Sequence, residues 1–392
     1  MRKLIITTAL AFFLAVLDTK AQQDFSFATV DSQSFALYEK ADWKALLNYG
    51  KTAIVNNQDF LLLRLRLGYA AFMLTNYSEA IRHYEVVLKE DQYNNTAHYY
   101  IYWSRINLNQ PEIAMAEVKY LSKGAIEEKK SKPAALTSAA LELSYKQTSV
   151  TTRKNPFYAR VGLGNRFSHG FHMQQSVATY QQKINEPLLT AVTHNNNINI
   201  RQVEYYNRLM LNLDRHWQLK AAYHYLHTPF NNFKYNNHLL LVGFKYNGNY
   251  FDLQADAILG KLTDTSVQQY NLQVGLYPKG NLDLYSFSTA MVRQQEGTAF
   301  NFKQVLGVKV LKNIWLEGNI TLGDFHNLAE NDALYVYNAI DPNKMKAGVT
   351  GIFLLPGNTV FQLGYTYEQR QLFGTTINFN QHSITGGLSW EF

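Results

Sequence analysis

Few residues in this 392-residue chain have the types and spacing that catalysis requires. Ser168 and His172 lie four positions apart, and a serine beside a histidine can act as a nucleophile with its general base. No third group that would orient the histidine is evident, and the pair falls at a turn between two predicted strands. A lipid-modifying hydrolase is therefore the weakest of three functional alternatives.

Two further pairs are poorly spaced for chemistry. Asp252 and Asp256 lie on one face of a predicted strand, about 13 Å apart at about 3.3 Å per residue. Glycoside hydrolysis by paired carboxylates needs roughly 5–9.5 Å. His224 and His227 fall on opposite strand faces, and the chain has no cysteine. We therefore predict a protein that is not an enzyme and needs no cofactor or metal.

Charged residues of both signs recur on one face of the predicted strands, where they would point into a barrel. Two interpretations are open: a polar lumen that conducts or exports a solute, or a packed lumen whose charges pair and keep a narrow barrel rigid. With Glu204 and Asp283, seven cations on this face stand against six anions, and this near balance favours pairing. The candidate lumen-lining residues are Arg160, Arg166, Arg208, Lys220, Lys245, Asp252, Asp256, Lys303, Lys309, Glu317 and Glu368.

The long connection Gly323–Asn343 combines acidic residues with tyrosines, among them Glu330, Asp332, Tyr335 and Tyr337. Such a segment could contact a glycan or fold inward as a constriction. The alternative is a loop that packs on the rim of the barrel.

The elements that position these residues are β-strands. From residue 140 to the C-terminus the sequence alternates with a period of two, in about 14 segments of mostly 10–15 residues. About 9–11 residues suffice for a tilted strand to cross a membrane. Short Gly, Pro, Asn and Asp turns alternate with longer links, as in outer-membrane barrels with short periplasmic turns and longer outer loops. We predict a transmembrane antiparallel β-barrel over residues 140–392.

The two faces of these strands differ as a barrel in lipid requires. Trp217 and Leu219 would face lipid, whereas Gln218 and Lys220 would point inside. Only 17% of the residues are charged, against roughly 25% in average globular chains. Because unpaired backbone groups are costly in lipid, the sheet must close on itself.

The N-terminus reads as a secretory signal peptide, Met1–Ala21, with a charged start, an apolar run over Leu4–Leu17 and small residues before the cleavage site. The apolar run is too short for the alternative, a membrane anchor. The formal charge of +7 is too mild to indicate a nucleic-acid partner. These features predict export to the envelope of a Gram-negative bacterium.

Residues 22–132 follow helical spacing with a period of 34 residues, so that Trp43 matches Tyr77 and Leu67 matches Ile101. Gly68 and Ala80 are small where two helices would approach closely. The pattern resembles tetratricopeptide repeats, which present a concave face to partner proteins; the alternative is an ordinary helical bundle. We predict α+β organisation: periplasmic repeats over 22–132, a linker over 133–139, then the barrel.

An aromatic cluster in the third repeat has two interpretations. It either packs between helices or lines a groove for a periplasmic protein partner. The cluster consists of Tyr99, Tyr100, Tyr102 and Trp103.

The chain ends in a strand with one apolar face, which includes Leu388, Trp390 and Phe392. This ending resembles the signal that bacterial outer-membrane barrels present to the barrel-assembly machinery. A soluble protein has no reason to place its bulkiest apolar groups at the free end of a strand, whereas outer-membrane lipid would cover them.

The C-terminal two-thirds resembles the YaiO-like outer-membrane barrel proteins at four segments: Leu141–Lys146, Arg160–Phe167, Gly248–Tyr250 leading into Phe251–Gly260, and Gly386–Phe392. That family pairs a periplasmic helical segment with a barrel and implies no catalytic mechanism. We expect a non-enzymatic outer-membrane scaffold in export or assembly of envelope or surface polysaccharide, with a glycan as a further possible ligand. The alternative is a passive small-solute channel.

Overall fold

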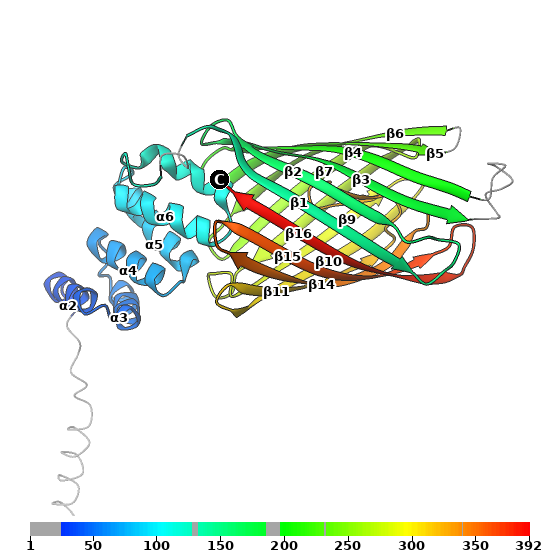
Figure 1. Cartoon of the computed structure of the whole chain (residues 1–392). Coiled ribbons are helices and arrows are strands. Elements are labelled where there is room, and N and C mark those ends of the chain that lie inside the picture. The colour runs from blue at the N-terminus through cyan, green and yellow to red at the C-terminus, as the bar shows by residue number, and fades with distance from the viewer. Residues whose placement is uncertain (1–24, 128–131, 186–196, 231–232, 339) are drawn as a thin grey trace, which may run out of the picture.

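The computed structural model describes residues 25–127, 132–185, 197–230, 233–338 and 340–392. A helical N-terminal region lies against one end of a closed β-barrel (Figure 1). We call this end of the barrel the helix-bearing end and the opposite end the loop-bearing end. The predicted signal peptide Met1–Ala21 lies outside the described residues.

The helices repeat as two-helix units. The first helices of successive units begin at Phe27, Leu61 and Asn95, at the 34-residue interval that the sequence predicts. The elements are α2 (Phe27–Glu39), α3 (Trp43–Val55), α4 (Leu61–Met73), α5 (Tyr77–Glu90), α6 (Asn95–Asn107), α7 (Pro111–Ala114) and the 3₁₀ helix η1 (Met115–Tyr120).

Local chemistry explains where these helices start and how closely they pack. The side chains of Asp42, Asn76 and Asn94 accept hydrogen bonds from backbone N–H groups three residues on, as N-caps do. At Gly68 an added Cβ would lie only 2.7 Å from the ring of Tyr84. The small residue therefore permits the close contact of α4 with α5.

Fourteen antiparallel strands close the barrel through the pairing of β1 with β16. Strand β1 begins at Ala134, so most of the segment 133–139 that we predict as a linker belongs to the barrel. The barrel strands are β1 (Ala134–Thr148), β2 (Phe157–Arg166), β3 (Phe171–Asn185), β4 (Asn197–Asn212), β5 (Trp217–Phe230), β6 (Phe233–Asn247), β7 (Phe251–Leu262), β8 (Thr265–Leu276), β9 (Leu284–Gln294), β10 (Thr298–Leu311), β11 (Ile314–Gly323), β14 (Asn343–Leu355), β15 (Thr359–Gln371) and β16 (Asn378–Glu391).

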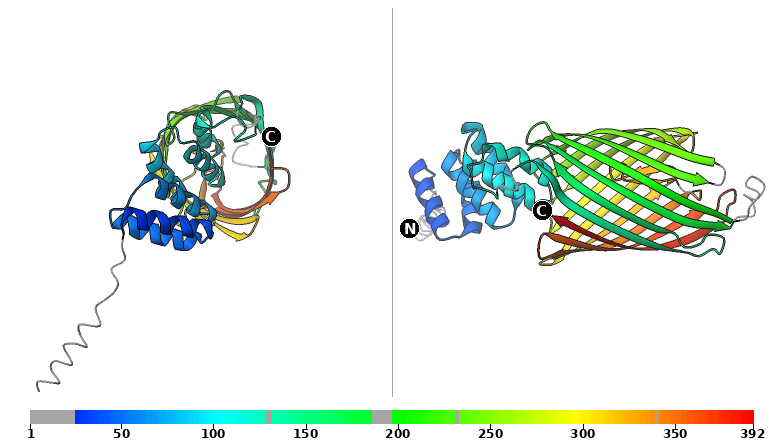
Figure 2. Two further views of the ribbon diagram at one scale, coloured as in Figure 1. Left: turned by 90° about the vertical axis from the view of Figure 1, so that its left-hand side faces the viewer. Right: turned by 45° about the horizontal axis from the view of Figure 1, so that its top comes forward.

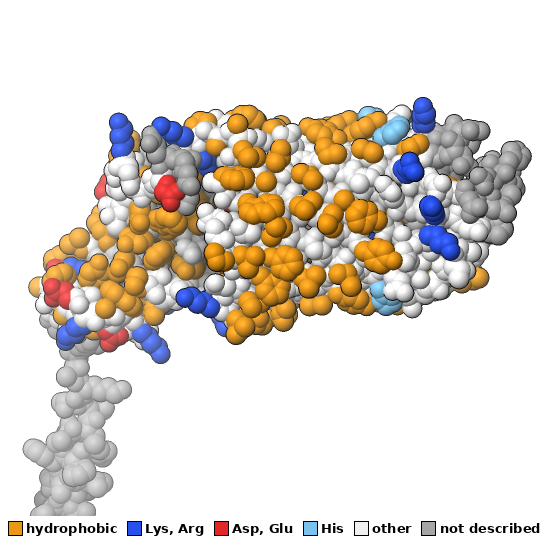
Figure 3. Space-filling view, in the orientation of Figure 1, with side chains coloured by type: hydrophobic (Ala, Val, Ile, Leu, Met, Phe, Trp, Pro, Cys, Tyr) orange, Lys and Arg blue, Asp and Glu red, His pale blue; other side chains and the backbone are white. Residues whose placement is uncertain are grey.

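The barrel wall is apolar outside and polar inside. Val177 and Leu272 are each 55% exposed on the outer face, whereas inward-facing Asp252 and Gln269 are almost fully buried. On the face of the barrel that Figure 3 shows, apolar side chains are spread over the middle, and most charged ones lie near the two ends. Lipid satisfies such an exterior, and strand pairing satisfies the backbone. The barrel is therefore built to span a membrane.

In the described part of the chain, no helix is both long enough and apolar enough to cross a membrane.

The connections at the loop-bearing end are less uniform than the sequence predicts. Strands β7 and β8 extend further than expected and meet in a two-residue turn, Thr263–Asp264. Both residues have positive φ, 51° and 62°, the conformation that continues the twist of a tight hairpin. The connection 324–342, between β11 and β14, is long as predicted.

The helices are fixed to the barrel by buried polar contacts. Arg105 is almost completely buried and donates hydrogen bonds to the backbone oxygens of Asn247 (3.1 Å) and Gly248 (3.0 Å). Ser78 N donates to Gly280 O at 3.0 Å, and a Cβ at Gly280 would lie 1.9 Å from Asn76 Oδ1. The turns that contain Gly248 and Gly280 therefore hold α6 and α5 against the end of the barrel.

Apolar packing completes this interface. Ile81 and Leu108 from the helices are buried against Tyr277 and Tyr285 of the barrel. Viewed from the helix-bearing end, the helices overlie one side of the barrel opening (Figure 2). The helical region is thus held in one orientation instead of hanging from a linker.

We expect Arg105→Ala to loosen this attachment, because each lost hydrogen bond to a charged group is worth roughly 1.5–3 kcal/mol. Spin labels on cysteines replacing exposed Lys89 and Lys312 would measure the distance between helices and barrel in this cysteine-free chain. The distance distribution should broaden in Arg105→Ala and stay narrow in the exposed-site control Lys44→Ala. A narrow distribution in both variants would contradict the role of Arg105.

Acid should loosen the same interface. Burial alone would raise the pKa of Glu79, but hydrogen bonds with His83 and Tyr250 and the charge of Arg82 hold it well below its ordinary value of 4.5. Tyr250 Oη donates to Glu79 Oε2 at 2.9 Å across the interface. Burial also lowers the pKa of His83 from 6.5.

Because both folded-state pKa values are depressed, the stabilisation is present above the ordinary values and is lost as pH falls. The spin-label distribution should therefore broaden first below about pH 6.5 and again below about pH 4.5. Glu79→Gln should already show part of the broadening at pH 7 and lack the lower transition. A distribution that does not change between pH 7.5 and pH 4 would contradict this linkage.

Candidate functional site

The connection between β11 and β14 folds into the barrel and does not pack on the rim. It forms a small hairpin of β12 (Leu328–Glu330) and β13 (Tyr335–Tyr337), which we call the lumen hairpin. Ala329 and Ala333 pack against inward-facing apolar residues of the wall, including Leu226, Leu241 and Ile258. The hairpin therefore narrows the lumen from one side.

Asp332 is the main ionic anchor of the hairpin. Its carboxylate lies 2.6 Å from Lys220 Nζ and 2.7 Å from Arg208 Nη1, and it accepts a hydrogen bond from Gln254 at 2.8 Å. Because Lys220 is almost fully buried, its charge needs this partner. Asp256 lies 3.7 Å from the same ammonium group.

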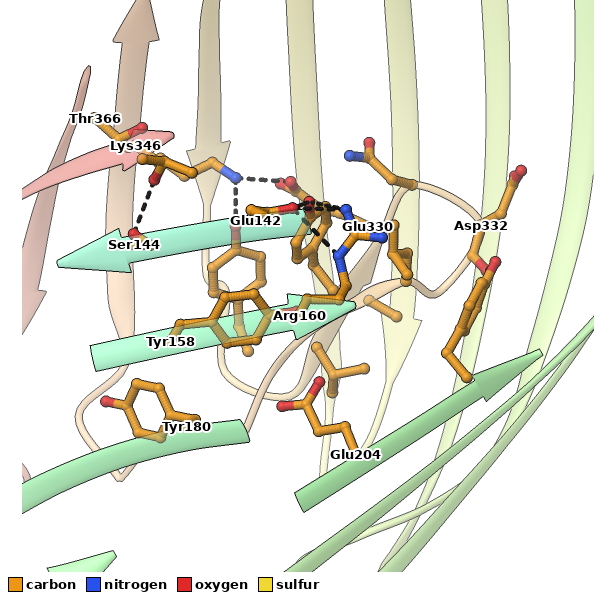
Figure 4. A pocket seen from close by; sticks show the side chains of 18 of the residues that line it. Glu142, Ser144, Tyr158, Arg160, Tyr180, Glu204, Glu330, Asp332, Lys346 and Thr366 are labelled. Carbon is orange, nitrogen blue, oxygen red and sulfur yellow. Dashed lines mark hydrogen bonds and ion pairs between the residues drawn. The ribbon is translucent and has the colours of Figure 1, made fainter. Parts of the chain in front are cut away.

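A second anchor joins the hairpin to the opposite strands. Glu330 is buried and pairs with Lys346 at 2.7 Å and with Lys303 at 3.2 Å. Lys346 also donates a hydrogen bond to the Tyr337 hydroxyl at 2.5 Å. Figure 4 shows Glu330 and Lys346 beside one pocket.

A third group of contacts reaches the first two strands. The Tyr335 hydroxyl donates to Glu142 at 2.7 Å, and Arg160 pairs with the same carboxylate at 2.6 Å. At the loop-bearing end, Arg153 holds Asp341 through two hydrogen bonds of 2.6 and 2.8 Å. The connection between β11 and β14 is thus held by three separate groups of contacts with the barrel.

Beside the hairpin the barrel encloses a cavity of about 1010 Å³. Its wall combines hydroxyl and amide groups with tyrosine rings, as at Tyr158, Tyr180 and Thr366 (Figure 4) and at Gln362. Hydroxyl and amide groups can both donate and accept hydrogen bonds. The cavity therefore offers uncharged hydrogen-bonding groups alongside apolar and charged side chains.

The candidate lumen-lining residues fall into three groups. Lys220 and Asp252 are buried beneath the cavity wall, and Asp252 pairs with Lys245 at 3.3 Å. Arg166 and Lys309 lie at the helix-bearing mouth, where Lys309 pairs with Asp283. The cavity itself is lined by Arg160, Arg208, Lys245, Asp256, Lys303, Glu317 and Glu368.

Several lumen residues were missed by the sequence reasoning. Lys146, Lys346 and Arg370 surround Glu368, and their position on the inward face of a strand was a usable signal. Arg153 and Asp341 lie in two different loops, where no periodicity applies. Only the folded structure brings this pair together.

The aromatic cluster contributes mainly to helix packing. Tyr102 is buried against Ala114 and Met115, with Trp103 half-buried beside it. Tyr100 stacks on Tyr84 with ring centroids 5.4 Å apart. Tyr99 and Tyr100 remain half-buried at the surface.

Ser168 and His172 do not form a dyad. Ser168 Oγ accepts hydrogen bonds from the backbone N–H groups of Gly170 (3.3 Å) and Phe171 (3.1 Å), so it caps a turn. His172 Nε2 lies 3.4 Å from His169 O.

The C-terminal residues close the barrel. Leu388 pairs with Leu141 of β1, and Trp390 pairs with Ala139. Phe392 N donates to Thr137 O at 3.0 Å. The residues that we predict as an assembly signal thus lie in the last strand of the chain, where it pairs with the first strand of the barrel.

No family model matches the sequence, and no curated protein matches it either. Solved structures with a similar fold include a FadL homologue from Pseudomonas aeruginosa, at 8% identity and a TM-score of 0.47, covering 72% of this chain and 92% of that one. A mutant of the TodX monoaromatic hydrocarbon channel matches at 6% identity and a TM-score of 0.47, covering 67% and 91% of the two chains.

The outer-membrane protein Omp33 of Acinetobacter baumannii matches at 8% identity and a TM-score of 0.39, covering 66% of this chain and all of that one. These identities and scores are too low to assign a function or a family.

We expect Asp332→Asn to release the lumen hairpin, because it leaves Arg208 without its closest carboxylate and Lys220 with only the more distant Asp256. Breaking a buried ion pair costs about 3–5 kcal/mol. In planar bilayers the variant should show larger and noisier current steps than the unsubstituted protein. The control Asp324→Asn removes a half-exposed carboxylate from the same connection and should not change the conductance. Equal conductance in both variants would contradict the role of Asp332 in holding the lumen hairpin in place.

Proposed function

We propose that the protein is a non-enzymatic integral outer-membrane protein that exports or assembles surface polysaccharide. Its helical repeats, of the tetratricopeptide kind, would lie in the periplasm and recruit a partner beside the barrel. The observation that carries the proposal is the rigid attachment of a repeat domain to the mouth of a barrel whose lumen holds a polar cavity.

The lengths of the connections between strands support one orientation of the barrel in the membrane. The helices share one end with the C-terminus and with short turns such as Lys312–Asn313. Outer-membrane barrels place their short turns in the periplasm. This arrangement supports a periplasmic position for the helices and an outer-leaflet position for the loop-bearing end.

The side chains of the lumen support a glycan as the ligand over an ion or an apolar molecule. Tyrosine rings can cover the apolar faces of sugar rings, and the amides and hydroxyls around them can bond to sugar hydroxyls. Interior charges such as Asp332 and Glu330 are already paired with lysines, so the polar groups left for a ligand are largely neutral.

The helical region offers a surface for a protein partner. Half-buried aromatic rings run across successive repeats, with Trp43 and Tyr69 centroids 5.3 Å apart and Tyr69 and Tyr100 centroids 5.4 Å apart. Tyr99 and Trp103 continue the row. We call these five residues the aromatic row. Aromatic anchors of this kind dominate the energy of many protein interfaces.

A passive small-solute channel is the second candidate, and the in-folded lumen hairpin favours it. A constriction in mid-lumen is what a size-selective pore needs. The two functions differ in their dependence on the helices, because a passive channel needs no partner.

The following strain comparison tests the export role. A strain lacking the protein should lose surface polysaccharide, and expression of the unaltered chain should restore it. Tyr99→Ala combined with Trp103→Ala should restore it poorly, because losing a hot spot of about 2 kcal/mol weakens partner binding roughly 30-fold.

The matched control is Tyr93→Ala, which removes an exposed aromatic ring outside the aromatic row. Barrel level in the outer membrane should be equal in all strains. Normal surface polysaccharide in the deletion strain would contradict the export role. Full restoration by the double variant would contradict the role of the aromatic row.

A further inference from the structure

Five cations gather on the outside of the barrel at its loop-bearing end. Lys183, Arg201, Lys234 and Lys261 lie near the ends of β3, β4, β6 and β7, and Lys154 lies in the loop between β1 and β2. All five are exposed. Lys154 N donates to Lys183 O at 2.8 Å, so the loop cation belongs to the same surface. We call these five residues the rim patch.

The rim patch differs from the lumen in how its charges are balanced. Lumen cations such as Arg208 and Lys346 have a carboxylate within 2.7 Å. Within the described ranges, none of the five patch cations forms an ion pair. Asp264, in the turn after Lys261, is exposed and makes no ion pair with it. The positive charge of the patch is therefore available to an external anion.

The patch lies at the height where lipid headgroups would be. On the same strands the apolar exterior includes Val203, Leu240 and Leu259, all exposed. On β6, His238 and Asn236 form an intermediate layer between Leu240 and Lys234, and they pair with Tyr225 and His227 of β5. On β4 and β7 the cations Arg201 and Lys261 are the next outward residues after Val203 and Leu259. The cations thus lie at the edge of the apolar band, where headgroups meet acyl chains.

The intermediate layer is itself structured. The Tyr223 hydroxyl lies 2.8 Å from His238 Nδ1, and the Tyr225 hydroxyl donates to Asn236 at 2.8 Å. These four residues and Tyr205 line a shallow groove on the barrel exterior. The groove opens beside the rim patch and would accept part of a lipid that the cations hold.

The charge is confined to one sector of the rim. Outward positions near the loop-bearing ends of β1, β8, β9, β15 and β16 carry neutral amides; they are Gln147, Gln268, Gln294, Gln369 and Asn380. Lys344, the second residue of β14, is paired with Asp324 at 3.7 Å. Unpaired outward cations among the described rim residues thus belong to β3–β7 and the adjoining loop. A general preference for basic residues at the membrane surface would not produce this asymmetry.

We propose that the rim patch binds a phosphorylated glycolipid of the lipid A class, a saccharide headgroup with two phosphates above several acyl chains. Neighbouring strands lie about 4.8 Å apart, so β3–β7 span roughly 20 Å. One phosphate cannot reach cations at both ends of this span, whereas two can. Lys and Arg bind phosphate through charge-assisted hydrogen bonds. This inference rests on the outer-membrane part of the proposed function but not on polysaccharide export.

Native mass spectrometry of the full-length protein in detergent would test the proposal with three probes: bisphosphorylated lipid A, monophosphorylated lipid A and phosphatidylglycerol. The first should bind most tightly. Lys183→Gln, Arg201→Gln and Lys234→Gln combined should weaken its binding at least about tenfold, since each basic residue near an anionic surface contributes appreciably. The control, Lys123→Gln, Lys279→Gln and Lys312→Gln combined, removes the same charge from exposed sites at or near the helix-bearing end and should bind normally.

Insertion of both triple variants into zwitterionic phosphatidylcholine vesicles, with a β-type circular dichroism spectrum, would show that the barrels are folded. Equal lipid A binding by the patch variant and the unsubstituted protein would overturn the proposal while leaving the barrel function intact. Equal binding of phosphatidylglycerol would overturn the assignment of a two-phosphate headgroup. Failure of the unsubstituted protein to insert would overturn the outer-membrane placement as well.

Discussion

Closure of the sheet between β1 and β16 is the constraint on which the rest of the structure depends. In a bilayer each backbone N–H and C=O group of a spanning segment needs a partner within the protein, because lipid offers none. Eleven consecutive residue pairs, from Ser138 with Glu391 to Thr148 with Gln381, join the two strands. A closed sheet of this size has an interior that side chains of the wall alone do not fill.

That interior explains the lumen hairpin. A barrel that places charges such as Lys220 inside must neutralise them, since an unpaired buried charge is costly. The hairpin brings Glu330 and Asp332 to these cations and so converts a set of isolated charges into a connected network. The same contacts narrow the lumen, so the stability of the barrel and the width of its lumen depend on the same residues.

Local periodicity made much of this fold predictable. Strand alternation and the 34-residue repeat depend on near neighbours in sequence, and the start of α5 at Tyr77 fits the predicted interval from Trp43. Arg153 and Asp341 lie 188 positions apart, and Asp332 lies 112 positions from Lys220 and 124 from Arg208, so no local pattern encodes these contacts. The tight turn Thr263–Asp264 was missed because neither residue is a glycine or an asparagine, the usual hairpin residues.

Charged residues are neutralised in a different way in each of three places: the lumen, the interface with the helices and the outer rim. Inside the barrel, carboxylates and cations come in pairs because no solvent or lipid neutralises them. At the interface with the helices, Arg105 is neutralised by carbonyl oxygens, which fixes orientation without requiring a complementary charge. On the outer rim, Arg201 and Lys234 are exposed and form no ion pair. An unpaired charge costs little free energy only where water or an anionic headgroup solvates it. The acidic residues of the barrel thus pair mainly with cations in the lumen, and the cations of the rim patch stay available to anions of the membrane.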